Sequence, residues 1–447
     1  MDNQEHNTNS KQQPSSSNTP STAQKQTSRM RPVIISAASA VAGLIVGGAG
    51  IYGLIKLTEK PQECPECNCS EDIAGPINGT DYSFLKLEKT GQNIVYSPLS
   101  INNGLSLLSA GAEGHTKDEI DSVLGSAEIP KYQNIPDKLS FANAVFIRDT
   151  FKDSVLSAYT DEVQNNLNGE VLYDSFESTD NMDNWVKQKT FNLIDQIGVQ
   201  VNPELKMVLS NALAIQMDWK NKFDPEETSS DFFYGLTDET EMEATTMHQK
   251  TSSPDTKYYY DDEVTALSMP LDTTSENVNL DFIAIMPSKS LVEYTKSLDE
   301  DDVDNIVNNF KPANETEGGV SISIPKFKID YSLNFKEDLE KLGIKSAFTS
   351  DADFSKMSTS PLSVGAALHE SNIDFSEDGV KAAAITVFSM KVISGQTEYD
   401  PQPIEITIDH PFLFLIRDAS DGTIWFTGTV YQPNLWADDA EQYTPSN

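Results

Sequence analysis

The sequence holds few of the side chains that catalyse reactions. Of its 447 residues only five are histidine and three are cysteine, and no cysteine follows Cys69. The folded part has no H-E-x-x-H, no G-x-S-x-G and no phosphate-binding loop. A catalytic triad assembled from distant residues would leave no motif, so hydrolysis stays an alternative. We predict a protein that is not an enzyme and that binds no metal and no cofactor.

Positive charge is also scarce. The chain has 32 lysine and arginine residues against 69 aspartate and glutamate residues, a formal net charge of -37. Such a field repels the phosphates of nucleic acids and favours solubility. We therefore predict no nucleic acid partner.

Residues 33–55 contain no charge at all. At 1.5 Å per residue, a helix of this length crosses the roughly 30 Å hydrocarbon layer of a bilayer. The polar lead is long for a cleaved signal peptide, so an uncleaved single-pass transmembrane helix is favoured. The flanking lysines and arginines lean slightly toward a cytoplasmic amino terminus. We predict a membrane protein whose large domain lies on the extracellular side.

Composition divides the rest of the chain. Residues 1–32 read as a disordered polar tail, and residues 435–447 as a second tail. Residues 56–78 form a juxtamembrane stalk with Cys64, Cys67 and Cys69, which are compatible with an intermolecular disulfide, an incomplete metal clip, free thiols or a plain stalk. Residues 79–434 have a globular composition without repeats, and we predict one large domain there.

Patterns within this domain predict both helices and strands. Ser97 and Pro98 precede apolar residues at helical spacing, and Gly343 is placed as a helix C-cap. Short runs such as "FANAVFI" and "VSISIPKFKI" are typical of strands. The class is α+β.

One segment does not fit an ordinary strand. "SEDGVKAAAITVFSMKVISG", residues 376–395, alternates with period two, but three consecutive alanines bury little area and favour strands weakly. The segment reads as a strand that inserts easily and is held weakly.

Several motifs together resemble the serpins, serine protease inhibitors that act as suicide substrates. The motifs are "NIVYSPLSI", "NWVKQKT", "NALAIQMDWKNKFDPEET", "IPKFKIDYSLNFKEDLEKLGIKSAF" and "DHPFLFLIRD" with "GTIWFTGTVYQP", in the family's order between about Asp81 and Pro433. The resemblance implies a serpin fold with three β-sheets, about eight or nine helices and an exposed reactive centre loop. Here the fold would be preceded by the transmembrane helix.

By this resemblance, residues 376–395 are the hinge and the reactive loop. The implied hinge residues are Glu377, Asp378, Gly379, Val380, Ala382, Ala383 and Ala384, and counting from Gly379 places the reactive bond between Ile393 and Ser394. A protease cuts this bond, the loop inserts into the main sheet as a new strand, and the acyl-enzyme is trapped. Insertion of the serpin loop is a known example of strand addition to a sheet and of the release of stored strain.

The resemblance implies further roles and partners. The shutter and breach, where the sheet opens, would contain Ser97, Ser100, Asn211, His369 and Trp219. Ile393 favours an elastase-like or subtilisin-like serine protease as target, whereas a slip to Lys391 favours a trypsin-like one; a cysteine protease is an alternative. Val380 and Ile385 depart from the family pattern and would slow insertion. We expect a monomer, and the rival function is a non-inhibitory serpin that acts as a binding or scaffold protein.

Overall fold

A computed structural model describes residues 39–47, 80–88, 91–125, 131–235, 241–273, 278–380 and 401–433. Eight α-helices and 19 strands are described, most of the strands in sheets of six, seven and four strands, with one further two-stranded ladder. This agrees with the predicted α+β class, the three sheets and the number of helices.

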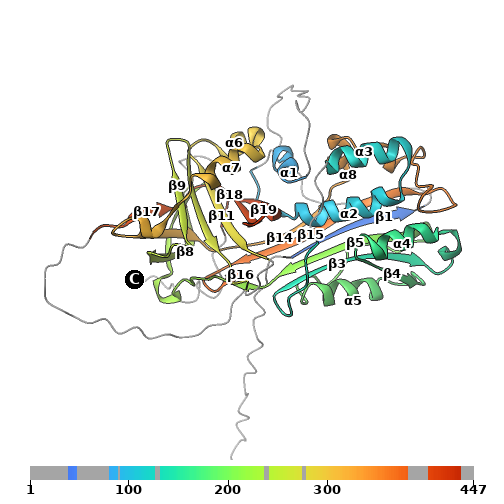
Figure 1. The fold of residues 1–447 in the computed structure, drawn as a ribbon, viewed down its shortest axis with the longest axis horizontal. Coiled ribbons are helices and arrows are strands. Elements are labelled where there is room, and N and C mark those ends of the chain that lie inside the picture. The colour runs from blue at the N-terminus through green and yellow to red at the C-terminus, as the bar shows by residue number, and fades with distance from the viewer. Residues whose placement is uncertain are drawn as a thin grey trace, which may run out of the picture. The chain divides into compact units, whose positions relative to one another are not determined.

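The six-stranded sheet, here called the main sheet, has the order β14-β15-β1-β5-β3-β4. All neighbouring strands in it are antiparallel except β3 and β4, which are parallel. Figure 1 shows β1 alongside β15 and β5. The bounds are β1 Ser39–Gly47, β3 Leu139–Arg148, β4 Gly169–Asp174, β5 Leu205–Ile215, β14 Phe327–Asn334 and β15 Ser363–Phe375.

Two other sheets complete the fold. The seven-stranded sheet has the order β12-β9-β10-β11-β18-β19-β2, and the four-stranded sheet the order β17-β13-β8-β7. Their bounds are β2 Ile94–Tyr96, β7 Ser229–Tyr234, β8 Glu241–Thr251, β9 Lys257–Tyr260, β10 Val264–Pro270, β11 Leu280–Pro287, β12 Lys311–Pro312, β13 Val320–Pro325, β17 Ile404–Thr407, β18 Phe412–Asp418 and β19 Ile424–Val430. The two-stranded ladder pairs β6, Met217–Asp218, with β16, Gly379–Val380.

The helices begin and end where local chemistry predicts. Ser97 caps α2 by accepting a hydrogen bond from the backbone N–H of Ser100, and α8 ends at Gly343, whose φ of +116° is left-handed. Their bounds are α1 Ser83–Leu87, α2 Pro98–Gly111, α3 Gly114–Leu124, α4 Ser157–Asn165, α5 Asp180–Lys189, α6 Leu291–Ser297, α7 Glu300–Asn308 and α8 Lys336–Leu342.

Helices cover both faces of the main sheet. The apolar side of α2 packs with Val145 and Leu209, while α5 packs Trp185 on Phe146, from the opposite face of the same strands. The Trp185 and Phe146 rings lie 5.7 Å apart, edge to face. Because side chains alternate along a strand, β3 and β5 contribute to both cores at once.

The structure differs from the prediction of a transmembrane helix over residues 33–55. Residues 39–47 form strand β1, paired with β15 on one side and β5 on the other. Within the described ranges, none of the helices has the length and apolar character needed to cross a bilayer. Hydropathy alone does not separate an uncharged span from an uncharged central strand, and a central strand satisfies its backbone groups on both edges. The other residues of the predicted span lie outside the described ranges.

Candidate functional site: the hinge after β15 and the centre of the main sheet

The chain turns sharply where β15 ends. Ser376 and Gly379 face each other in a β-bridge, and each backbone N–H donates to the other residue's carbonyl at 3.2 Å. Gly379 and Val380 then form β16 and pair with Asp218 and Met217 of β6. The predicted hinge residues 377–380 therefore lie directly after the main-sheet strand, at the point where the chain leaves the sheet.

Gly379 is required by this geometry. Its φ is +139°, a conformation that residues with a Cβ rarely adopt. A Cβ at this position would lie 2.5 Å from the carbonyl oxygen of Met217 and 2.6 Å from Asp218 Cα. Both atoms belong to the backbone of β6, so a side chain here displaces the strand that holds the hinge.

Charged side chains fix the first two hinge residues. Glu377 accepts a hydrogen bond from Thr228 Oγ1 at 2.8 Å and forms an ion pair with Lys326 at 3.2 Å, both carboxylate and amine being mostly buried. Asp378 pairs with Lys222 at 3.1 Å. Burial lowers the pKa of Lys222, but hydrogen bonds to Asp218 and Asp378 outweigh burial and raise it above its ordinary value. The predicted hinge is thus anchored by one buried charge pair, Glu377 with Lys326, and one more exposed pair, Asp378 with Lys222.

Trp219 joins the hinge to the core. Its backbone N–H donates to the carbonyl of Asp378 and its Nε1 to the carbonyl of Ser376, both at 2.8 Å. The indole is only 2% exposed and packs edge to face on Phe375 and Phe282. These contacts place Trp219 against the residues that follow β15, and its role where the loop would enter the sheet stays a prediction.

Three of the predicted shutter residues, Ser97, Ser100 and His369, meet at the main sheet. The backbone N–H of Ser97 donates to His369 Nε2 at 3.1 Å, which assigns the ring proton of the neutral imidazole to Nδ1. Ser97 Oγ accepts from the Ser100 N–H at 3.0 Å. All of these side chains, and that of Asn211, are fully buried. The bond between Ser97 and His369 joins residues 272 positions apart in the chain, and Asn211 lies on β5, across β1 from His369.

Two asparagines that sequence reasoning missed extend this cluster. Asn211 Nδ2 donates to Asn143 Oδ1 at 2.8 Å, and Asn143 Nδ2 donates to Asn103 Oδ1 at 3.3 Å. Asn143 lies in the middle of the apolar run "FANAVFI". A buried amide costs free energy unless it is hydrogen-bonded. An asparagine inside an apolar strand therefore indicates a buried hydrogen-bond partner, and this was the signal in the sequence.

Strand β1 passes between two of the predicted shutter residues, His369 on β15 and Asn211 on β5. Ala42 is the register partner of His369 on β15 and of Asn211 on β5. Asn211 Oδ1 and Ser100 Oγ are buried and have no hydrogen-bond partner among the described atoms. We call the position between β5 and β15 the slot, and β1 occupies it antiparallel to both neighbours.

Comparison with known proteins identifies the family. Residues 82–433 match the family model described as "Serpin (serine protease inhibitor)". The chain belongs to the serpin family. Serpins are generally protease inhibitors rather than enzymes.

Similar serpins come from distant organisms. Serpin-Z2A of Triticum aestivum is 27% identical over 380 residues, covering 77% of this chain and 91% of the relative. Intracellular coagulation inhibitor 2 of Tachypleus tridentatus is 29% identical over 367 residues, covering 77% and 87%. The crystal structure of the thermophilic serpin tengpin in its native state superposes with a TM-score of 0.66 at 25% identity, covering 84% of this chain and 97% of that one.

Other predicted site residues of this serpin are not described. Ala382, Ala383, Ala384, Ile393 and Ser394 lie outside the described residues, as does the side chain of Val380. Among the residues that are described, no cluster of three or more His, Cys, Asp or Glu side chains is arranged to hold a metal.

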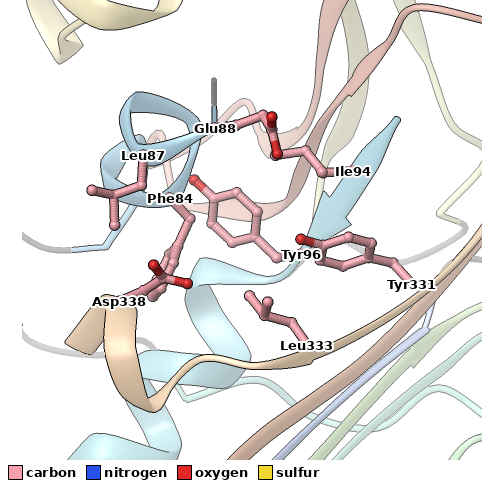
Figure 2. A pocket seen from close by; sticks show the side chains of 8 residues that line it. All are labelled: Phe84, Leu87, Glu88, Ile94, Tyr96, Tyr331, Leu333 and Asp338. Atoms are coloured by element: carbon pink, nitrogen blue, oxygen red, sulfur yellow. The ribbon is translucent and has the colours of Figure 1, made fainter. Parts of the chain in front are cut away.

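A separate pocket lies below α1, away from the hinge. Figure 2 shows side chains from α1, β2, β14 and α8 around it. Burial, with smaller contributions from Glu88 and Asp338, raises the pKa of Tyr331 in its wall to about 12. The lining is Phe84, Leu87, Glu88, Ile94, Tyr96, Tyr331, Leu333 and Asp338. None of these lining residues contacts residues 376–380, so we take the predicted hinge and the slot as the candidate functional site.

Proposed function

We propose that this serpin inhibits serine or cysteine endopeptidases as a suicide substrate, by inserting its cut reactive loop into the slot. The observation that carries the proposal is the position of the hinge. Residues 376–380 leave the end of β15, and β15 is one wall of the slot between β5 and β15. A loop that starts at this turn reaches the slot without crossing another strand.

The anchored hinge supports a defined order of events. Glu377 and Asp378 are tied to Lys326 and Lys222, so they keep their positions while the chain beyond Gly379 swings. Gly379 and Val380 already pair with β6, which continues the line of β5, so an entering loop would extend this pairing along the slot. The inserted strand gains ladder hydrogen bonds and apolar burial on both sides, which supplies the driving free energy.

The sequence of the loop supports the same mechanism. Ala382, Ala383 and Ala384 are small and uncharged, so they enter a closed sheet with little steric resistance. We place the cut between Ile393 and Ser394, which favours an elastase-like or subtilisin-like target. A cut after Lys391 would select a trypsin-like protease.

The rival function is a serpin whose loop is cut without trapping, and which acts as a binding or scaffold protein. A membrane location stays a prediction from the hydropathy of residues 33–55. It needs a different conformation of residues 39–47, because a segment paired between two strands of the sheet is not available to a bilayer.

The experiment is a protease panel with elastase-like, subtilisin-like and trypsin-like members. We expect a denaturant-stable complex at the summed mass and a released peptide that begins at Ser394. Ala382→Asp should turn the inhibitor into a substrate, because a charge on the inserted face opposes burial. Lys381→Gln, on the other face of the alternating segment, is the matched control and should still trap the protease. Complete cleavage without a complex, for every protease, would refute inhibition.

A further inference from the structure

Strand β1 follows the path that the proposed function gives to the cut loop. Its first residue, Ser39, pairs with Asn372 near the hinge, and its last, Gly47, pairs with Ser363 at the far end of β15. A loop that turns back from β15 at Ser376 runs in this same direction. Both segments would be antiparallel to β15 and to β5.

Register shows how much of the path is shared. Continuing the bridge between Ser376 and Gly379 as an antiparallel ladder pairs Asn372 with Ala383. Asn372 is already the partner of Ser39. A loop inserted in this register would therefore meet β1 at Ala383, four residues beyond Gly379.

We propose that residues 39–47 are an internal strand that competes with the reactive loop for the slot, so that the protein traps a protease only after this segment has left the sheet. The inference deepens the proposed function and depends on it for its inhibitory consequence. Trapping requires insertion before the acyl-enzyme is hydrolysed. A strand paired on both edges must separate from two neighbours first, and the protease escapes in that time.

The shutter indicates that β1 is a replaceable occupant. The extended register places Thr386 opposite His369, where Ala42 now lies. Residues directly opposite in neighbouring strands share a face of the sheet. Asn211 Oδ1 is buried there without a hydrogen-bond partner among the described atoms. A threonine hydroxyl can donate to it, whereas alanine has no such group.

The first experiment tests the occupant with an engineered disulfide. Ala40 and Ser371 are register partners on β1 and β15, and both are small. The full chain carries Ala40→Cys and Ser371→Cys, with Cys64, Cys67 and Cys69 replaced by serine. The control pairs Ala40→Cys with Asn372→Cys, one residue out of register and therefore on the opposite face. We expect a cross-link in the first variant and none in the control.

The second experiment uses this cross-link as a switch. The oxidised variant should be cleaved by the protease without forming a stable complex, and reduction should restore the complex. Absence of the cross-link, or formation of the stable complex by the oxidised form as readily as by the reduced form, would overturn the competition.

The third experiment is independent of inhibition. Ala42→Pro together with Leu44→Pro removes two N–H donors from a central strand, which prolines rarely enter. A synthetic peptide with the sequence of residues 380–392 should raise the thermal midpoint of this variant and leave that of the unmodified chain unchanged. A matched variant, Thr22→Pro in the polar tail, should behave as the unmodified chain.

The outcomes separate the two proposals. If the peptide stabilises the proline variant selectively but neither that variant nor the reduced chain traps any protease, the competition stands and the inhibitory function fails. If the peptide stabilises the unmodified chain equally, β1 does not fill the slot and the inference is wrong.

Discussion

Replacing Gly379 by alanine tests whether the hinge is held rigidly against β6. The substitution has two costs. An L-residue at the observed φ of +139° is strained by about 1–3 kcal/mol. The new Cβ also lies within 2.6 Å of Met217 O and Asp218 Cα, distances that real Cβ atoms essentially never show. Relief of that overlap requires β16 to leave β6, with loss of its pairing, or several tenths of an ångström of backbone movement.

Gly343 provides a matched control. Its φ of +116° is also positive, but a Cβ there meets nothing within 4 Å. Gly343→Ala therefore has the backbone cost of about 1–3 kcal/mol without the overlap. We expect Gly379→Ala to cost about 1–3 kcal/mol more than the control, the usual range for overpacking. The difference measures the close approach of the hinge to β6.

Urea unfolding of the two full-length variants measures these free energies, and hydrogen exchange of the β6 and β16 amides reports where the strain goes. We expect faster exchange at residues 217–219 in Gly379→Ala only, because β16 separates from β6. Equal destabilisation by both substitutions, with unchanged exchange at β6, would show that the hinge moves aside freely and would refute the anchored hinge.

Three further substitutions probe neighbouring interactions. Trp219→Phe removes the indole donor to the Ser376 carbonyl, which still accepts a hydrogen bond from the N–H of Gly379. We expect the free energy of unfolding in urea to fall by about 1 kcal/mol for the lost bond, plus the cost of lost packing. Glu377→Gln should destabilise by about 1.5–3 kcal/mol, the range for hydrogen bonds to charged groups, and Lys326→Met in the same chain should remove most of that difference in a double-mutant cycle. Burial, and to a smaller degree Glu300, raises the pKa of Asp81 from 3.8 to about 6. The protonated carboxyl therefore favours folding at low pH, and this stability is lost as pH rises from 3.8 through 6. Asp81→Asn should stabilise the fold by at most ~3 kcal/mol near pH 7 and by little near pH 4, as measured by urea unfolding at both pH values.

Sequence reasoning predicted the elements whose local chemistry is distinctive. Pro98 after the Ser97 cap, and Gly343 after an amphipathic run, mark helix ends by backbone geometry that few other residues satisfy. The hinge was predicted from an acidic pair, a glycine and an alanine run that stand together, and the first four of its residues follow β15 in the structure. These signals depend on neighbouring residues, and a single sequence contains them.

The contacts that sequence reasoning missed depend on residues far apart in the chain. Lys326 meets Glu377 because β14 begins beside the end of β15, where Phe327 pairs with Phe375, and no spacing in the sequence indicates that pair. The hydrogen bond of Asn143 to Asn103 likewise joins β3 to α2. Strand β1 is the largest difference between the sequence prediction and the structure. It lies within 23 uncharged residues, and such a composition is compatible with a membrane span and with a central strand alike.

Residues 39–47 cannot be a strand of the main sheet and a membrane helix at the same time. A change between the two conformations would control whether the proposed inhibitor can insert its loop. Within the sheet, backbone groups of β1 pair with β5 and β15. Within a bilayer, the same groups must pair inside a helix, since hydrocarbon offers them no partner. Residues 39–47 in a membrane helix would therefore not fill the slot, whereas in the described structure they do. If both conformations exist, lipid vesicles added to the full chain should increase trapping of a protease, and the oxidised Ala40→Cys and Ser371→Cys variant should not respond. Equal trapping with and without vesicles, in a chain that sediments with them, would show that β1 and the membrane segment act independently.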